Sequence, residues 1–187
     1  MHALVAFPVW DGNAAAFVES VRRRFDPQAP SIAAHFTLVF PTAIAVERWW
    51  PEVTAELRTV RRFPVALRDL HVEAPAAEGD CHLFLLPSMR SRDGVARSEG
   101  ANELRALHEQ LHSGVLRGEL RADRPYLPHV TIGRFGDRVA ASTCAAVVER
   151  ELATAPGVAL TGAVSAVQRV DVVDGRIELG ARLDFAG

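Results

Sequence analysis

Two short segments of the chain each place a threonine two residues after a histidine. One segment reads HFTLVF and contains His35 and Thr37, and the other reads HVTIGRF and contains His129 and Thr131. Side chains alternate along a β-strand, so the histidine and the threonine of each segment emerge on one face while the apolar residues between them emerge on the other. A single histidine in an apolar run is usually a core residue, but the recurrence of the pattern points to a shared function.

Two imidazoles and two hydroxyls facing one small volume suit phosphoester chemistry. The ordinary pKa of histidine is near 6.5, so one ring can be neutral and act as a general base while the other is protonated and acts as a general acid, without a metal. The hydroxyls of Thr37 and Thr131 can donate to the non-bridging phosphate oxygens, where negative charge develops. The sequence alone does not decide which histidine is the acid.

The elements that must hold these segments follow from hydrophobic periodicity and turn signals. Helices are expected over 14–25, 46–60, 102–113 and 138–152, and strands over 5–9, 63–72, 81–87, 163–173 and 176–185. The two histidine segments add two more strands. The last two strands form a hairpin around Asp174-Gly175, which is the strongest short turn signal of the chain.

The two halves of the chain repeat this order of helix, histidine strand, helix and two strands. We therefore predict an α+β fold that is bilobal and duplicated, with two sheets rich in antiparallel strands around a central cleft and helices on the outer faces. The whole chain, 1–187, forms a single domain in this prediction. Lobes related by a pseudo-two-fold axis span approximately 10–88 and 101–187, joined by a loop over 89–100.

Composition narrows the function further. Charged residues make up 24% of the 187 residues, the formal net charge is −2, and all basic residues are arginine. The lack of lysine excludes lysine nucleophiles, Schiff bases and a phosphate-loop lysine, and the net charge argues against a basic surface for long nucleic acids. No apolar run reaches the ~20 residues of a membrane span, and no signal-peptide pattern is present. We expect a cytoplasmic monomer that does not bind membranes.

The paired histidine–threonine motifs resemble those of the two-histidine (2H) phosphoesterase superfamily, which includes 2′-5′ RNA ligase-like proteins and cyclic phosphodiesterases. The segment PHVTIGRF carries the most specific part of this resemblance. It implies an enzyme without a cofactor or metal that cleaves, or in reverse forms, 2′,3′-cyclic or 2′-5′ phosphodiesters on RNA ends or small nucleotides. It also implies that His35 and His129 are the catalytic pair and that Thr37 and Thr131 bind phosphate oxygens.

Four further residues are candidates for binding a substrate. Phe84 and Tyr126 have rings on which a nucleobase could stack, although core packing is an alternative for both. Arg134 follows the second motif, but alternation directs it away from His129 unless the strand bulges there. Arg90, in the polar loop between the halves, could reach a phosphate, and a solvated loop charge is its alternative.

Two other functions are compatible with the sequence. A protein that binds phosphorylated RNA ends or nucleotides without turnover would use the same face, although the presence of all four motif residues favours catalysis. The segment from His108 to His112 matches H-E-x-x-H, a zinc-protease signature with Glu109 as the base. However, His108 falls on the apolar stripe of its predicted helix, and we expect it to pack in the core.

Overall fold

A computed structural model describes residues 1–75, 79–87, 100–120, 125–155 and 158–186. The helices are α1 (Ala14–Phe25), α2 (Val46–Leu57), α3 (Ala101–Leu111) and α4 (Arg138–Thr154), with a 3₁₀ helix, η1 (Val115–Glu119). The strands are β1 (His2–Ala6), β2 (Val9–Trp10), β3 (Phe36–Thr42), β4 (Phe63–Glu73), β5 (Cys81–Pro87), β6 (Val130–Phe135), β7 (Thr161–Val164), β8 (Ala166–Val173) and β9 (Arg176–Asp184).

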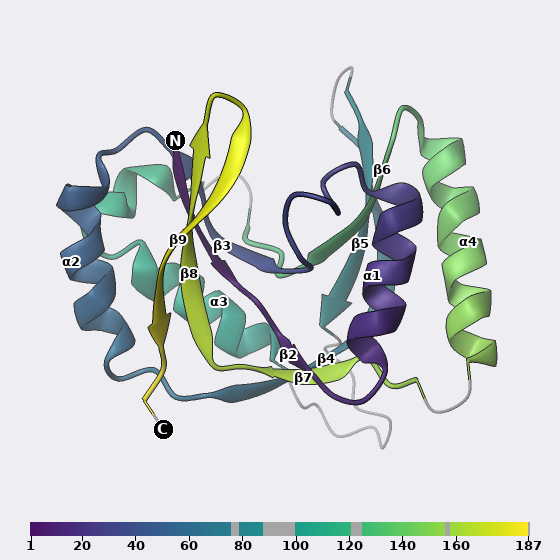
Figure 1. The fold of residues 1–187 in the computed structure, drawn as a ribbon, viewed down its shortest axis with the longest axis horizontal. Coiled ribbons are helices and arrows are strands. Elements are labelled where there is room, and N and C mark those ends of the chain that lie inside the picture. Colours follow the sequence, from purple (N-terminus) through teal and green to yellow (C-terminus); the bar gives the residue numbers. More distant parts are fainter. Residues whose placement is uncertain (76–78, 88–99, 121–124, 156–157, 187) are drawn as a thin grey trace.

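The strands follow one another in the order β2-β7-β4-β5-β6-β3-β1-β8-β9, and every neighbouring pair of strands in this order is antiparallel. The junction between β3 and β6 is narrow, since Phe36 and Val130 form the one registered pair there. On one side of this junction α3 packs on β3 and α2 packs against α3; on the other side α1 and α4 pack on β6 (Figure 1). The predicted α+β class is confirmed, and the two expected sheets are joined at β3 and β6.

The elements of the two halves of the sequence interleave around this junction. Helix α1 precedes the first histidine strand but packs on β6, and α3 precedes the second histidine strand but packs on β3 (Figure 1). Strand β5 lies beside β6 and β4 follows β5, whereas β8 lies beside β1 and β9 follows β8. The lobe boundaries at 10–88 and 101–187 and their two-fold relation stay a prediction.

Apolar side chains of the two motif strands fill the core beneath the helices. Phe36, Leu38, Val130 and Ile132 are fully buried, as the alternation of each motif predicts. Burial of an aliphatic or aromatic side chain of this size contributes about 1.5–3 kcal/mol, so these residues fix which face of each strand turns away from the core. The other face carries the histidines and threonines.

Two expected strands differ from the structure. The strand expected over 5–9 is divided into β1 and β2, with Pro8 between them. The strand expected over 163–173 breaks at Ser165, where β7 leaves its partners β2 and β4 and the chain continues as β8 beside β1 and β9. The carbonyl of Ser165 accepts a hydrogen bond from the amide of Phe185, the residue after β9, and so continues the pairing of β8 with β9. This break lets one segment of chain serve both sides of the β3–β6 junction.

The expected hairpin around Asp174-Gly175 is confirmed. Both residues have positive φ angles, 48° and 76°, as the tight turns of such hairpins require. Among the described helices, none has the length and apolar character needed to span a membrane.

Candidate active site

The register between β3 and β6 brings the two motifs together on one face. Phe36 lies opposite Val130, and continuing this antiparallel pairing by one residue in each direction places His35 across from Thr131 and Thr37 across from His129. Residues opposite one another in antiparallel strands point to the same side. Phe36 and Val130 point into the core, and the four motif residues, which are all half-buried, share the opposite face. The common face predicted from the alternation is therefore what the register produces.

The two histidine rings are held in the same way by the backbone. Nδ1 of His35 lies 2.8 Å from the carbonyl oxygen of Ala33, and Nδ1 of His129 lies 2.7 Å from that of Leu127. A carbonyl oxygen only accepts, so each Nδ1 carries a hydrogen and donates it. In the neutral ring Nε2 is then the unprotonated nitrogen, ready to accept a proton from a substrate or water.

Burial disfavours the protonated form of both rings. Desolvation, together with the neighbouring imidazoles of His35 and His82, lowers the pKa of His129 to about 4, although the Leu127 carbonyl and the Glu73 carboxylate act in the opposite direction. Desolvation also lowers the pKa of His35, helped by the Arg22 guanidinium, while the carboxylates of Asp26 and Glu19 act in the opposite direction. The two motif histidines thus differ in the charges around them.

Phe84 lies directly against the second motif. Its ring stacks on the His129 ring with the centroids 3.8 Å apart, and its backbone pairs with Thr131. The side chain is 8% exposed, and it contributes to the desolvation of His129. The imidazole covers one face of the Phe84 ring, so a nucleobase would have to stack on the other face. Such stacking stays a prediction.

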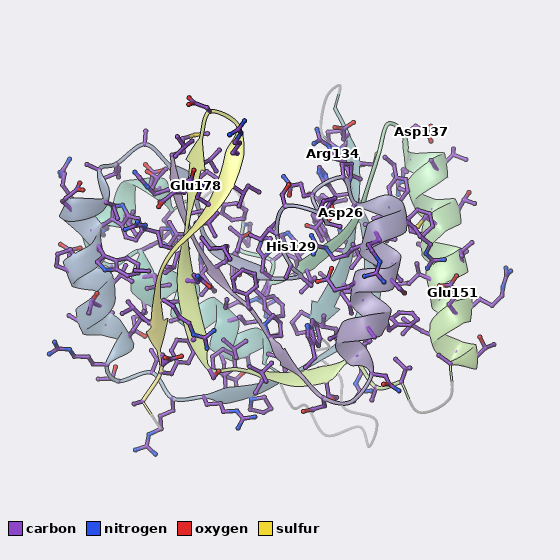
Figure 2. All side chains as sticks on the ribbon, viewed as in Figure 1. Asp26, His129, Arg134, Asp137, Glu151 and Glu178 are labelled. Carbon is purple, nitrogen blue, oxygen red and sulfur yellow. The ribbon has the colours of Figure 1, made fainter. Side chains whose placement is uncertain are left out.

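A bulge in β6 decides where Arg134 lies. Leu83 pairs with Gly133 and Phe84 pairs with Thr131, so one step along β5 spans two steps along β6. The extra residue reverses the alternation, and Arg134, which pairs with His82, returns to the face of Thr131. Arg134 donates to the Asp80 carboxylate at 2.6 Å, and Figure 2 labels it on β6 beyond His129. Its role in substrate binding stays a prediction.

Two further histidines, His71 and His82, lie on this face. The rings of His71 and His82 lie 6.4 Å and 6.0 Å from Phe84, nearly parallel to it, and so extend the aromatic surface beside His129. Nε2 of His71 lies 3.0 Å from the Glu73 carboxylate. The alternation of His82 and Phe84 along one strand was the signal that could have placed them on this face.

Tyr126 supports the first motif from outside the strand. Its hydroxyl donates to the Thr37 carbonyl at 3.0 Å, and its ring stacks on His108 with the centroids 4.0 Å apart. Nδ1 of His108 donates to the carbonyl of the next residue, Leu38, at 2.7 Å. Burial raises the pKa of the Tyr126 hydroxyl, so this hydroxyl remains a donor. Stacking of Tyr126 on a base stays a prediction.

The H-E-x-x-H segment on α3 has a structural explanation. His108 and His112 are 6% and 3% exposed, and Nδ1 of His112 donates to the His108 carbonyl at 2.6 Å. Glu109 is exposed on the other side of the helix. Within the described ranges, no group of three histidine, cysteine, aspartate or glutamate side chains converges as a metal site. His108 packs as predicted, and we do not propose a zinc site here. Arg90 lies outside the described residues.

Comparison with known proteins adds to this geometry. Residues 10–171 match the family model of the 2′-5′ RNA ligase superfamily. Over 118 residues the chain is 29% identical to "Putative phosphoesterase GK0864" of Geobacillus kaustophilus and 31% identical to "Putative phosphoesterase" of Geobacillus thermodenitrificans. Each alignment covers 63% of this chain and 61% of the relative's length.

Solved structures show the same fold. Escherichia coli LigT in complex with 3′-AMP superposes with a TM-score of 0.61 at 17% identity, covering 100% of this chain and 98% of LigT. Kluyveromyces marxianus Usb1 superposes with a TM-score of 0.57 at 13% identity (98% and 97% covered), and TT0787 of Thermus thermophilus with 0.55 at 18% (99% and 98% covered). The family match confirms the resemblance seen in the paired motifs, and this chain belongs to the 2′-5′ RNA ligase superfamily of 2H phosphoesterases.

Proposed function

We propose that this protein is a metal-independent phosphoesterase that hydrolyses 2′,3′-cyclic or 2′-5′ phosphodiesters of RNA ends or small nucleotides. Its catalytic residues are His35, Thr37, His129 and Thr131. The same groups would support ligation when a ribose hydroxyl instead of water attacks a 2′,3′-cyclic phosphate: the new P–O bond forms as one P–O bond of the ring breaks, and the leaving ribose oxygen takes up a proton.

The observation that carries this proposal is the register at Phe36 and Val130. It pairs each histidine with the threonine of the other motif, so that the reacting phosphorus would have an imidazole and a hydroxyl on each side. This suits an in-line displacement, in which the attacking and leaving oxygens are on opposite sides of phosphorus. The hydroxyls donate to the two non-bridging oxygens.

The surroundings of the two histidines favour one division of roles. His129, whose pKa burial lowers to about 4, is unprotonated at neutral pH and serves as the base. Its Nε2 takes the proton of the attacking water as the new P–O bond forms. His35, which has the carboxylates of Asp26 and Glu19 nearby, is the better place for a proton, and its Nε2 passes that proton to the leaving ribose oxygen as the old bond breaks.

Names of the related proteins support this substrate class. The two Geobacillus relatives are called phosphoesterases. Solved structures of LigT contain 3′-AMP, NADP⁺ or phosphate, and one of Usb1 contains uridine monophosphate. A phosphate group is common to these ligands, and three of them are nucleotides, which supports a small nucleotide or an RNA end as the substrate. We propose a cytoplasmic monomer acting on such a substrate.

The test is hydrolysis of the four 2′,3′-cyclic nucleotides and of a 2′-5′-linked dinucleotide, with and without EDTA, followed by separation of the 2′- and 3′-phosphate products. We expect turnover of a cyclic nucleotide that EDTA does not change. Tight binding without turnover would instead support the non-catalytic binder, and loss of turnover in EDTA would contradict the metal-independent mechanism.

A further inference from the structure

A buried ionic cluster on α1 lies beside the first motif. Nε and Nη2 of Arg22 donate to Oδ2 of Asp26 at 2.9 and 2.8 Å, and Nη1 donates to the Glu19 carboxylate at 3.2 Å. Arg22 is 1% exposed and Asp26 is 6% exposed. Burying charges costs desolvation energy, and apolar side chains often stabilise such a position equally well. Stability alone is therefore a weak reason for this cluster.

The cluster holds the segment that leads into His35. Residues 26–35 form neither a helix nor a strand. Backbone hydrogen bonds hold the turns from Asp26 to Ile32, and side chains of the cluster tie the segment to α1. Arg22 Nη1 donates to the carbonyl of Ile32 at 2.8 Å, and the Ala34 amide donates to Oε1 of Glu19 at 2.7 Å. These two bonds flank Ala33, whose carbonyl accepts the hydrogen of His35 Nδ1.

The same helix lies against the strand of the second motif. Phe25 of α1 and Phe135 of β6 have ring centroids 6.1 Å apart. A Cβ added at Gly133 would come within 3.3 Å of Phe25 Cβ and 2.6 Å of the Phe135 ring, so a side chain at this position would collide with the packed rings. Figure 1 shows that β6 runs beside α1 and that the chain after α1 turns toward β3. Figure 2 labels Asp26 at the end of α1, and His129 and Arg134 along β6.

We propose that Glu19, Arg22 and Asp26 are positioning residues for His35, an inference that rests on the proposed function of that histidine. By fixing Ile32 and Ala34, the cluster aims the Ala33 carbonyl at His35 Nδ1. This holds the ring in one tautomer, with Nε2 free for the substrate. Because α1 also packs on β6, the cluster sets the orientation of His35 relative to the strand that carries His129.

Glu19→Ala tests the proposal, with Arg24→Ala as the matched control. Arg24 lies on the same helix and pairs with Glu151 of α4, away from the segment 26–35. The readouts are the ¹⁵N NMR signals of the histidine rings, which report tautomer and titration, together with kcat and KM for a 2′,3′-cyclic nucleotide. We expect Glu19→Ala to mix the two tautomers of His35 and to lower kcat about 10- to 100-fold with little change in KM, as small misplacements of reacting groups do.

The conservative variant provides the rescue. Glu19→Gln keeps an oxygen that accepts from the Ala34 amide, so it should retain the Nδ1–H tautomer and most of kcat. Arg24→Ala should match wild type in every readout. If Glu19→Ala does not fold, Asp26→Asn preserves the shape of the cluster and removes one of its charges. In this variant the two tautomers of His35 should also mix, but to a smaller extent.

A wild-type His35 spectrum in folded Glu19→Ala or Asp26→Asn overturns the proposal, whatever the activity. An equal fall in kcat for Arg24→Ala also overturns it, because the effect would then belong to the helix as a whole. If the wild-type protein turns over none of the nucleotides, the proposed function fails, and the NMR spectrum alone decides whether the cluster positions His35.

Discussion

The two His-x-Thr motifs have the same backbone geometry and different surroundings. In both, the histidine donates from Nδ1 to the carbonyl two residues earlier. His129 is covered by the stacked ring of Phe84 at 3.8 Å, whereas His35 meets the Phe7 ring edge-on at 5.9 Å. Two imidazoles and the Glu73 carboxylate act on the pKa of His129, whereas an arginine and two carboxylates act on the pKa of His35.

The comparison shows that the position of each histidine ring and its affinity for a proton depend on different contacts. The shared backbone bond places each ring and fixes its tautomer, and nothing in it distinguishes an acid from a base. The aromatic cover and the neighbouring charges, which differ between the two sites, act on the pKa of each ring. Repeated motifs can in this way present matching groups to a phosphate and still assign them different proton-transfer roles.

The largest expected effect is the loss of either imidazole. In His35→Asn and His129→Asn the amide nitrogen can still donate to the carbonyl of Ala33 or Leu127, so the fold should persist. Neither variant can transfer a proton, and we expect kcat for a 2′,3′-cyclic nucleotide to fall about 10²–10⁴-fold in each. Steady-state kinetics measure this.

The matched control is His2→Asn, which changes a histidine paired with Asp171 and not on the motif strands. It should retain wild-type kcat. If His35→Asn or His129→Asn keeps activity near that of the control, the two-histidine mechanism is wrong.

The second effect is on the pH dependence. The base, His129, must be unprotonated, so kcat/KM should fall as the pH drops toward its pKa of about 4. The acid, His35, must be protonated, so kcat/KM should fall about tenfold per pH unit once the pH exceeds the pKa of His35. This pKa is lowered from its ordinary value of 6.5, so the fall begins below pH 6.5. We expect a bell-shaped profile with an acidic optimum.

Phe84→Leu tests which histidine produces each limb of the pH profile. Removing the ring opens His129 to water, so its pKa should rise and the acid limb of kcat/KM should move to higher pH while the alkaline limb stays in place. A shift confined to the alkaline limb would reverse the roles of the two histidines.

Loss of a threonine hydroxyl should cost less than loss of a histidine. Thr37→Val and Thr131→Val keep the β-branched shape and remove a donor to a charged phosphate oxygen, a bond worth about 1.5–3 kcal/mol. The expected fall in kcat/KM is therefore about 10- to 150-fold. The pH profile should keep its shape, because no titrating group is changed; a displaced limb in either variant would show that the threonines act by tuning the histidines instead.

The face of the motif strands could be predicted from sequence because it depends on local alternation. Phe36 and Val130 had to be buried, and their neighbours therefore had to share the other face. The position of Arg134 could not be predicted in this way. It depends on a bulge between β5 and β6, which becomes visible only when the pairing partner is known.

Contacts between elements far apart in the chain also could not be predicted from the sequence. The order of the elements was predictable from periodicity, but which strand each helix would cover was not, since α1 and α3 pack on strands from the opposite halves of the chain. Arg22 follows the apolar spacing of α1 and looks like any charged helix residue until its contacts with Asp26 and Ile32 are known. Burial of a charge depends on tertiary contacts, and helical spacing does not encode it.

The smallest expected effect belongs to a contact that supports only one of the two motifs. Tyr126→Phe removes the hydrogen bond to the Thr37 carbonyl and leaves the ring stacked on His108. A neutral hydrogen bond contributes about 0.5–1.5 kcal/mol, so we expect kcat/KM to fall about 2- to 13-fold, with little change in the pH profile. The effect should be absent in a Thr37→Val background if Tyr126 acts through the Thr37 hydroxyl, and a double-mutant cycle measures this. Additive losses in that cycle would mean that Tyr126 contacts the substrate or stabilises the fold independently of the first motif.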